Sequence, residues 1–173
     1  MELDPFDESF QGSYGGMLIQ AGRYDEGIAR LQDALKTAPN DPGFHTLLRD
    51  AFYATGRYDE ALTEWKALFF TPGEHGLADA MDRGYAEGGF REAVRRTAEI
   101  WSARSDTIYV PPHGVAALFV AAGEHDRALD WLERGVQIRN PNMPGFVSGA
   151  PILDTLRDDP RFQDLLRRMN LPY

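Results

Sequence analysis

The stretch that decides the fold is Gly56-Arg57-Tyr58-Asp59-Glu60-Ala61, because near-copies of it recur along the chain. The other copies are Gly22-Arg23-Tyr24-Asp25-Glu26-Gly27, Gly88-Gly89-Phe90-Arg91-Glu92-Ala93 and Gly123-Glu124-His125-Asp126-Arg127-Ala128. Their first glycines lie 34, 32 and 35 residues apart. A period of about 34 residues is typical of arrays in which each unit is a helical hairpin. The repeat therefore predicts an all-α fold.

Each position of the repeated stretch has a mechanical role in such a hairpin. The glycine ends the first helix, where a left-handed residue is needed. The aromatic ring two residues later opens the second helix and wedges against its partner; these residues are Tyr24, Tyr58, Phe90 and His125. The small residue three positions further on lets two helix backbones approach closely; these residues are Gly27, Ala61, Ala93 and Ala128.

Start signals for helices agree with this period. Asp41 before Pro42 predicts an N-cap with proline in the first turn. The segment Thr71-Pro72-Gly73-Glu74 predicts a capping box. Residues of β-branched type are sparse, and no alternating run is bounded by hairpin turns.

These residues resemble the tetratricopeptide repeat. The first two copies match best, through Gly15, Leu18, Gly22, Tyr24, Ala34 and Pro39, then Leu48, Phe52, Gly56, Tyr58 and Ala61. The resemblance implies a right-handed solenoid of about four helical hairpins. We expect a partial preceding repeat or linker in residues 1–7, the array in residues 8–139, and a loop with C-terminal capping helices in residues 140–173.

The tail is similar to the endings of certain bacterial multidomain proteins, in which such arrays follow a winged-helix, nucleotide cyclase or Ser/Thr kinase domain. Asp159 is expected to cap a last helix that begins at Pro160, with one apolar stripe made of Phe162, Leu165, Leu166 and Met169. A helix of this kind closes the open end of a solenoid. Met143, Phe146 and Val147, in the preceding loop, are expected to tuck under this cap.

The N-terminal residues Glu2-Leu3-Asp4-Pro5 stand in register with the last turn of a repeat. They are either a vestigial linker or the remainder of a longer array. The second alternative makes the chain a C-terminal module of a larger regulatory protein.

The charge of the chain excludes two classes of partner. The formal net charge is -9, whereas a nucleic-acid binder needs clustered cations to neutralise phosphates. An anionic membrane surface is disfavoured for the same reason. There is no cysteine, and the N-terminus lacks the basic and apolar segments of a signal peptide. We expect a soluble cytoplasmic protein that needs no cofactor.

The first helices of successive hairpins line the concave face of a solenoid, which is the face that repeats use for binding. The residues predicted to contact a partner there are Gln20, Thr46, Asp50, Tyr53, His75, Asp82, Tyr85 and His113. This surface lacks the Lys and Asn pattern that clamps a carboxylate terminus. A peptide or helical segment with apolar anchors and a basic residue fits it better.

Catalytic residues are not predicted. His45 and His75 are expected to begin helices and to be exposed or half-buried, and His125 serves as a wedge residue. His75 and Asp79 are four residues apart and could form half a metal site, but such a pair is usually only a hydrogen bond. The sequence predicts a protein-interaction scaffold. The alternatives are self-association through the N-terminal repeat end, with Phe6, Phe10 and Tyr14, and, remotely, a small-ligand or metal-dependent enzyme.

Overall fold

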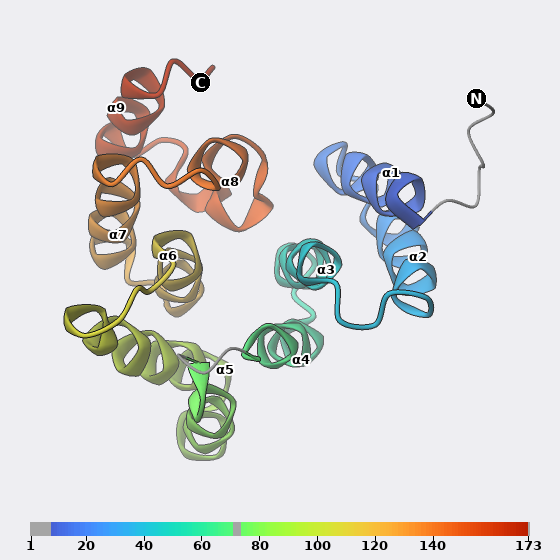
Figure 1. Ribbon diagram of the computed structural model, residues 1–173, viewed down its shortest axis with the longest axis horizontal. Coiled ribbons are helices and arrows are strands. Elements are labelled where there is room, and N and C mark those ends of the chain that lie inside the picture. Colours follow the sequence, from blue (N-terminus) through green and yellow to red (C-terminus); the bar gives the residue numbers. More distant parts are fainter. Residues whose placement is uncertain (1–7, 71–73, 173) are drawn as a thin grey trace. The chain divides into compact units, whose positions relative to one another are not determined.

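The computed structural model describes residues 8–70 and 74–172, with side chains from residue 12 onward. The described residues form helices and turns and no strand, which confirms the all-α helical-hairpin class. The chain divides into two compact units, Met1–Leu68 and Phe69–Tyr173. Figure 1 shows the helices in chain order.

The first unit consists of two helical hairpins. Helix α1 packs on α2, α3 packs on α4, and α2 also contacts α3. The bounds are α1 (Glu8–Gln20), α2 (Tyr24–Leu35), α3 (Pro42–Ala54) and α4 (Tyr58–Leu68).

The second unit begins with a long helix and ends with short ones. Helix α5 packs on α6, α6 packs on α7, and both α8 and α9 contact α7. The bounds are α5 (Leu77–Ala103), η2 (Arg104–Asp106), α6 (Pro112–Ala122), α7 (His125–Gln137), α8 (Met143–Gly149), η3 (Pro151–Leu156) and α9 (Pro160–Arg168).

Three of the four predicted turn glycines adopt the left-handed conformation. Gly22, Gly56 and Gly123 have φ angles of 75°, 73° and 79°. After each glycine, the next N–H donates to the carbonyl five residues earlier, in the bonds Arg23 to Leu18, Arg57 to Phe52 and Glu124 to Phe119. This pattern is the Schellman motif, which satisfies carbonyls that the end of a helix leaves open.

The third copy departs from the prediction at its glycine. Gly88 has φ -152°, and the positive φ falls on Gly89, with φ 72° and ψ -160°. That region of backbone space is accessible essentially to glycine alone. The second glycine therefore makes the bend, and α5 is a third hairpin whose two halves are joined without an intervening loop.

The predicted close approaches of paired helices are confirmed where glycine makes them. A Cβ atom on Gly27 would lie 3.0 Å from the carbonyl oxygen of Gly15 on the facing helix. In α5, a Cβ atom on Gly84 would lie 2.7 Å from Cα of Ala93. Ala61, Ala93 and Ala128, at the small position of the other copies, are fully buried.

The two helix starts predicted from capping aspartates follow the predictions. The carboxylate of Asp41 accepts a hydrogen bond from the Phe44 N–H at 3.0 Å, and that of Asp159 accepts one from the Arg161 N–H at 2.8 Å. Most of the predicted capping box lies outside the described residues, and α5 begins at Leu77, after Gly76 with φ 79°.

The C-terminal segment contains more helix than predicted. Residues 140–150 were expected to form a loop, but Met143–Gly149 form α8. Its apolar residues Met143, Phe146 and Val147 are buried as expected, because the helix turns them toward one side. The α9 residues Phe162, Leu165 and Leu166 are buried as well, whereas Met169 is only half-buried at the end of that helix.

Candidate partner-binding surface

The residues predicted to contact a partner in the first unit lie on α1 and α3. Gln20 is exposed at the end of α1, and Thr46 and Tyr53 are half-buried on α3. The Tyr53 ring lies 5.8 Å from that of Tyr58 on α4. All three residues remain accessible to a partner in part.

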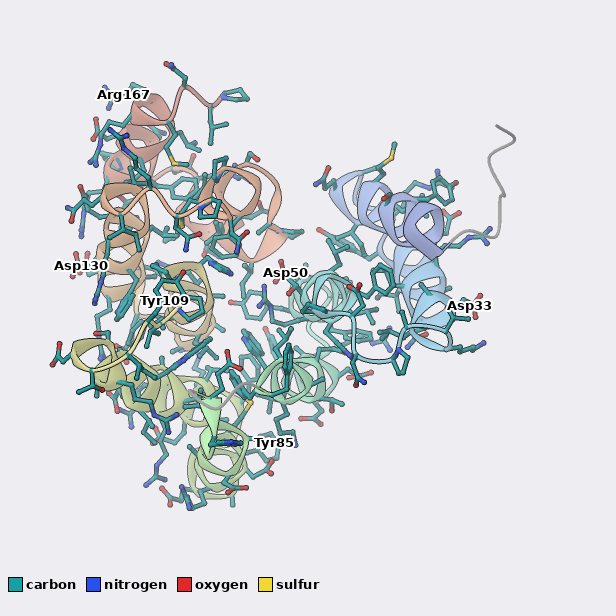
Figure 2. All side chains as sticks on the ribbon, in the orientation of Figure 1. Asp33, Asp50, Tyr85, Tyr109, Asp130 and Arg167 are labelled. Atoms are coloured by element: carbon teal, nitrogen blue, oxygen red, sulfur yellow. The ribbon has the colours of Figure 1, made fainter. Side chains whose placement is uncertain are left out.

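Asp50 is the exception, because it is buried rather than open to solvent. Its side chain is labelled in Figure 2, and the residue is only 2% exposed. Arg49 donates to its Oδ1 through Nε at 2.8 Å and through Nη2 at 2.6 Å. The Arg49 guanidinium also lies over the Trp65 ring, 5.4 Å from its centroid. The expected acidic contact is instead half of a buried ion pair.

Burial and the neighbouring Arg49 act on the pKa of Asp50 in opposite directions. Burial raises the pKa of the Asp50 carboxyl, because a carboxylate loses its hydration inside the protein. The charge and hydrogen bonds of Arg49 act in the opposite direction. Arg49 therefore offsets part of the effect of burial on Asp50, and the buried carboxyl is not available to a ligand.

His45 is a second correction, because it is buried rather than exposed or half-buried. Its Nδ1 lies 2.5 Å from Oε2 of Glu64 on α4, and its Nε2 lies 3.0 Å from the carbonyl oxygen of Pro39. The imidazole thus joins three segments of the first unit. This contact is structural, and no local sequence pattern predicts it, because Glu64 is 19 residues away.

A hollow of about 370 Å³ opens between α1 and the start of α3. It is lined by Gly12, Ser13, Ala38, Asp41, Gly43, Phe44 and Leu47. Glycine creates the space, because a Cβ atom on Gly12 would overlap the Phe44 ring. Gly16 faces Leu47 in the same way, one turn further along α1.

Most of these lining residues were missed from the sequence. Gly12 and Gly16 are buried against α3 and are not among the predicted contacts. The sequence does contain a signal for this packing. Gly12 and Gly16 are four residues apart and so share one face of α1, and the large residues Phe44 and Leu47 on the next first helix fill the space that they leave. The hollow lies between first helices of successive hairpins, where the binding face was predicted.

In the second unit, the predicted residues do not form one cluster. Asp82 and Tyr85 are exposed on the first half of α5, and Figure 2 labels Tyr85 there. His113 is half-buried on α6, with its ring 5.8 Å from that of Phe146.

His75 is exposed but precedes α5, so it does not share a helix with Asp79 as predicted. Its carbonyl oxygen accepts a hydrogen bond from Arg104 at 2.9 Å. Within the described part of the chain, no three His, Asp or Glu side chains are grouped so that they could hold a metal ion. In that same part, no helix combines the length and apolar character needed to cross a bilayer.

Comparison with known families agrees with the geometry of the first unit. Residues 18–68, which extend from the last turns of α1 to the end of α4, match the family model of the tetratricopeptide repeat. These residues are therefore similar to the tetratricopeptide repeat. Repeats of this family generally mediate protein–protein interaction. Neither a curated protein nor a solved structure matches the chain.

The matched residues contain all four residues predicted for the first unit, namely Gln20, Thr46, Asp50 and Tyr53. They also contain five of the seven residues that line the hollow. The match does not reach the tail, so the resemblance of that segment to bacterial regulators stays a prediction.

Proposed function

We propose that this chain is a non-catalytic scaffold that binds a peptide or helical segment of a partner protein. We further propose that it serves as the C-terminal module of a larger bacterial regulatory protein. The observation that carries the first proposal is the hollow between α1 and α3, because it is open to solvent between two first helices.

The lining of the hollow suits an apolar anchor side chain. Phe44 and Leu47 are half-buried and supply apolar surface, while Ser13 and Asp41 supply polar groups. Ligand pockets typically combine apolar surface of this kind with a few polar groups. A partner side chain would remove the remaining exposed apolar area of Phe44 and Leu47 from water.

The charge of the same lining favours one class of partner over another. The residues that line the hollow include Asp41 and no Lys or Arg. A carboxylate terminus would lose its hydration there without gaining a counter-charge. An apolar or basic segment is therefore the proposed ligand, with Gln20, Thr46 and Tyr53 as further contacts on the first unit.

Selection of peptides against the folded chain tests this proposal. A library of random dodecapeptides displayed on phage would be panned on the chain, and enriched peptides would be measured by fluorescence anisotropy. Ser13→Trp fills the hollow, so we expect it to weaken binding at least tenfold. Gln32→Trp, an equally large change on an exposed position of α2, should leave binding unchanged. Equal binding to both variants would show that the hollow is not the site.

Self-association is a second candidate function, supported by exposed apolar residues on α1. Met17 is 65% exposed, and Tyr14 on the same helix is also exposed, beneath the guanidinium of Arg30. Phe6 lies outside the described residues, as does the side chain of Phe10. Light scattering over a range of concentrations tests this candidate. A dimer that Met17→Glu abolishes would support it, and a monomer at every concentration would exclude it.

A further inference from the structure

The second unit carries an exposed surface that the proposed function does not use. It comprises Ile108, Tyr109, Arg134, Ile138 and Arg139, and is called the Tyr109 surface below. Ile108, Tyr109 and Ile138 are 41%, 66% and 51% exposed. Figure 2 labels Tyr109 on the segment that leads into α6.

Hydrogen bonds hold the two segments of this surface together. Nη1 of Arg134 on α7 donates to Oγ of Ser105 at 3.0 Å. Nδ2 of Asn140 donates to the hydroxyl oxygen of Tyr109 at 2.6 Å. The residues of the Tyr109 surface are therefore neighbours in space, although 29 to 31 positions separate the bonded partners in sequence.

Tyr109 is held in place before any partner arrives. Asn140, which fixes its hydroxyl group, is buried, and its own Oδ1 accepts a hydrogen bond from the Asn142 N–H at 2.9 Å. The ring is tethered at one end and its face is open to solvent. A side chain ordered in this way loses little conformational freedom on binding, which favours association.

The cations of the Tyr109 surface lack the partners that other arginines have. Arg161 and Arg168 pair with Asp130 and Glu133 at 2.5 Å and 2.6 Å. Within the described part of the chain, neither Arg134 nor Arg139 forms an ion pair, and Arg134 instead stacks on Trp131. Asp106 is the one carboxylate on the adjoining η2 segment. The local balance is thus positive in a chain whose net charge is -9.

The backbone of Arg139 gives a second, independent indication. Arg139 ends α7 with φ 52°, at the position where Gly22, Gly56 and Gly123 end other helices with similar angles. A side chain in this conformation is strained, and glycine is not. A cation stands where glycine would be more stable, and strain of this kind is typical of functional positions.

We propose that the Tyr109 surface binds a short acidic segment of a partner protein that carries an apolar side chain. The apolar side chain packs on Tyr109 and Ile138, while carboxylates of the segment pair with Arg134 and Arg139. The assignment rests on charge complementarity, since uncovered cations flank an uncovered apolar surface. This site is separate from the hollow on the first unit and has the opposite charge preference.

Titration with two synthetic hexapeptides tests the proposal. One contains Phe and Leu flanked by Glu and Asp, and the other contains the same Phe and Leu flanked by Lys. Amide resonances of the ¹⁵N-labelled chain report where each peptide binds. We expect saturable shifts at Ile108, Tyr109 and Ile138 with the acidic peptide alone.

Charge reversal supplies the matched controls. Arg134→Glu combined with Arg139→Glu should weaken binding of the acidic peptide roughly five- to tenfold, as the loss of two exposed charge pairs implies. Arg83→Glu with Arg91→Glu, which reverses two exposed charges on α5, should leave affinity unchanged. Arg139→Gly relieves backbone strain, so it keeps the fold intact and should still weaken binding.

Three outcomes would overturn the proposal. The first is no saturable shift at these amides, and the second is an equal response to the basic peptide. The third is broadening of the same resonances that disappears on dilution without peptide, because a second copy of the chain would then occupy the surface.

Discussion

The hairpins α1–α2 and α3–α4 follow the same 34-residue register but fill their helix–helix contacts differently. In the first hairpin, Gly15 and Gly16 leave α1 without side chains at its helix contacts, and Leu31 fills the space beside Gly15. In the second hairpin, the corresponding positions are Arg49, Asp50 and Trp65. Arg49 there lies over the Trp65 ring and is neutralised by Asp50.

These three positions differ between the two hairpins as a set. An arginine beside Leu31 would leave a buried charge without a counter-ion, and a tryptophan beside Gly15 would exceed the space that glycine leaves. Arg49 needs Asp50 for charge and Trp65 for packing. The same helical hairpin is thus stabilised in one case by close glycine packing and in the other by a buried ion pair over an aromatic ring.

The largest effect is expected from Arg49→Met, which keeps apolar contact with Trp65 but leaves the Asp50 carboxylate buried and unpaired. We expect a loss of about 3 kcal/mol in the free energy of unfolding at pH 7, measured with urea. Adding Asp50→Leu should recover most of this loss, since replacing both partners of a buried pair by apolar groups is often neutral. Asp79→Ala, at an exposed position, should change stability by less than about 0.5 kcal/mol.

The pH dependence of the Arg49→Met variant follows from the pKa of Asp50. Burial raises this pKa above its unfolded value, so the folded state binds the proton more tightly than the unfolded state. The stability that this proton contributes is present at low pH and is lost as the pH rises through the folded-state pKa. The deficit of Arg49→Met relative to the natural chain should therefore shrink as the pH is lowered. A deficit that grows instead would contradict the assigned direction.

Gly84→Ala tests the glycine contact in the third hairpin. Its Cβ atom would meet the backbone of the second half of α5, which no side-chain rotation can relieve, with Cα of Ala93 at 2.7 Å and the Glu92 carbonyl oxygen at 2.8 Å. We expect a loss of about 2 kcal/mol by urea denaturation, despite the better helix propensity of alanine. Gly145→Ala in α8, where an added Cβ atom would meet nothing within 4 Å outside its own helix backbone, should be neutral or slightly stabilising.

Asp41→Ala removes the cap that begins the first helix of the second hairpin. The Phe44 N–H would lose its acceptor, and we expect a loss of about 1 kcal/mol in thermal or urea unfolding. Asp41→Asn keeps an oxygen acceptor in the same place and should cost only a few tenths of that amount. Equal losses in the two variants would show that charge, and not the hydrogen bond, stabilises this helix start.

The parts of the fold that could be predicted depend on short stretches of sequence. The glycine turns at Gly22, Gly56 and Gly123 and the caps at Asp41 and Asp159 each involve residues within one or two turns. Such signals depend on local backbone geometry, which only a few residue types satisfy. Even in the third copy the bend was located within one residue, although two adjacent glycines left open which of them carries the positive φ.

The parts that could not be predicted depend on pairs distant in sequence. His45 was expected to be accessible, but it is buried in the first unit, where its ring nitrogens contact Glu64 and the Pro39 carbonyl oxygen. Asp50 was expected on the binding face, but it is buried in an ion pair with Arg49, whose guanidinium lies over the Trp65 ring. Hydrophobic periodicity assigns a side chain to one face of a helix, but it does not identify the polar group from another segment that pairs with that side chain. Whether the accessible predicted residues contact a partner stays a prediction.

The smallest effect is expected from Arg139→Gly, which extends the glycine turn shared by both hairpins of the first unit to the end of α7. Glycine removes the strain of a left-handed arginine, about 1 kcal/mol, but gains freedom in the unfolded chain. The net expectation is a gain of about 0.5 kcal/mol in the free energy of unfolding. Arg139→Ala, which keeps a Cβ atom at the same φ, should give no such gain. Thermal unfolding of both variants separates backbone strain from loss of the guanidinium, because only the glycine variant relieves the strain while both lose the charge. A gain in the glycine variant together with weaker binding of the acidic peptide would mean that the chain gives up stability at this position to present a cation.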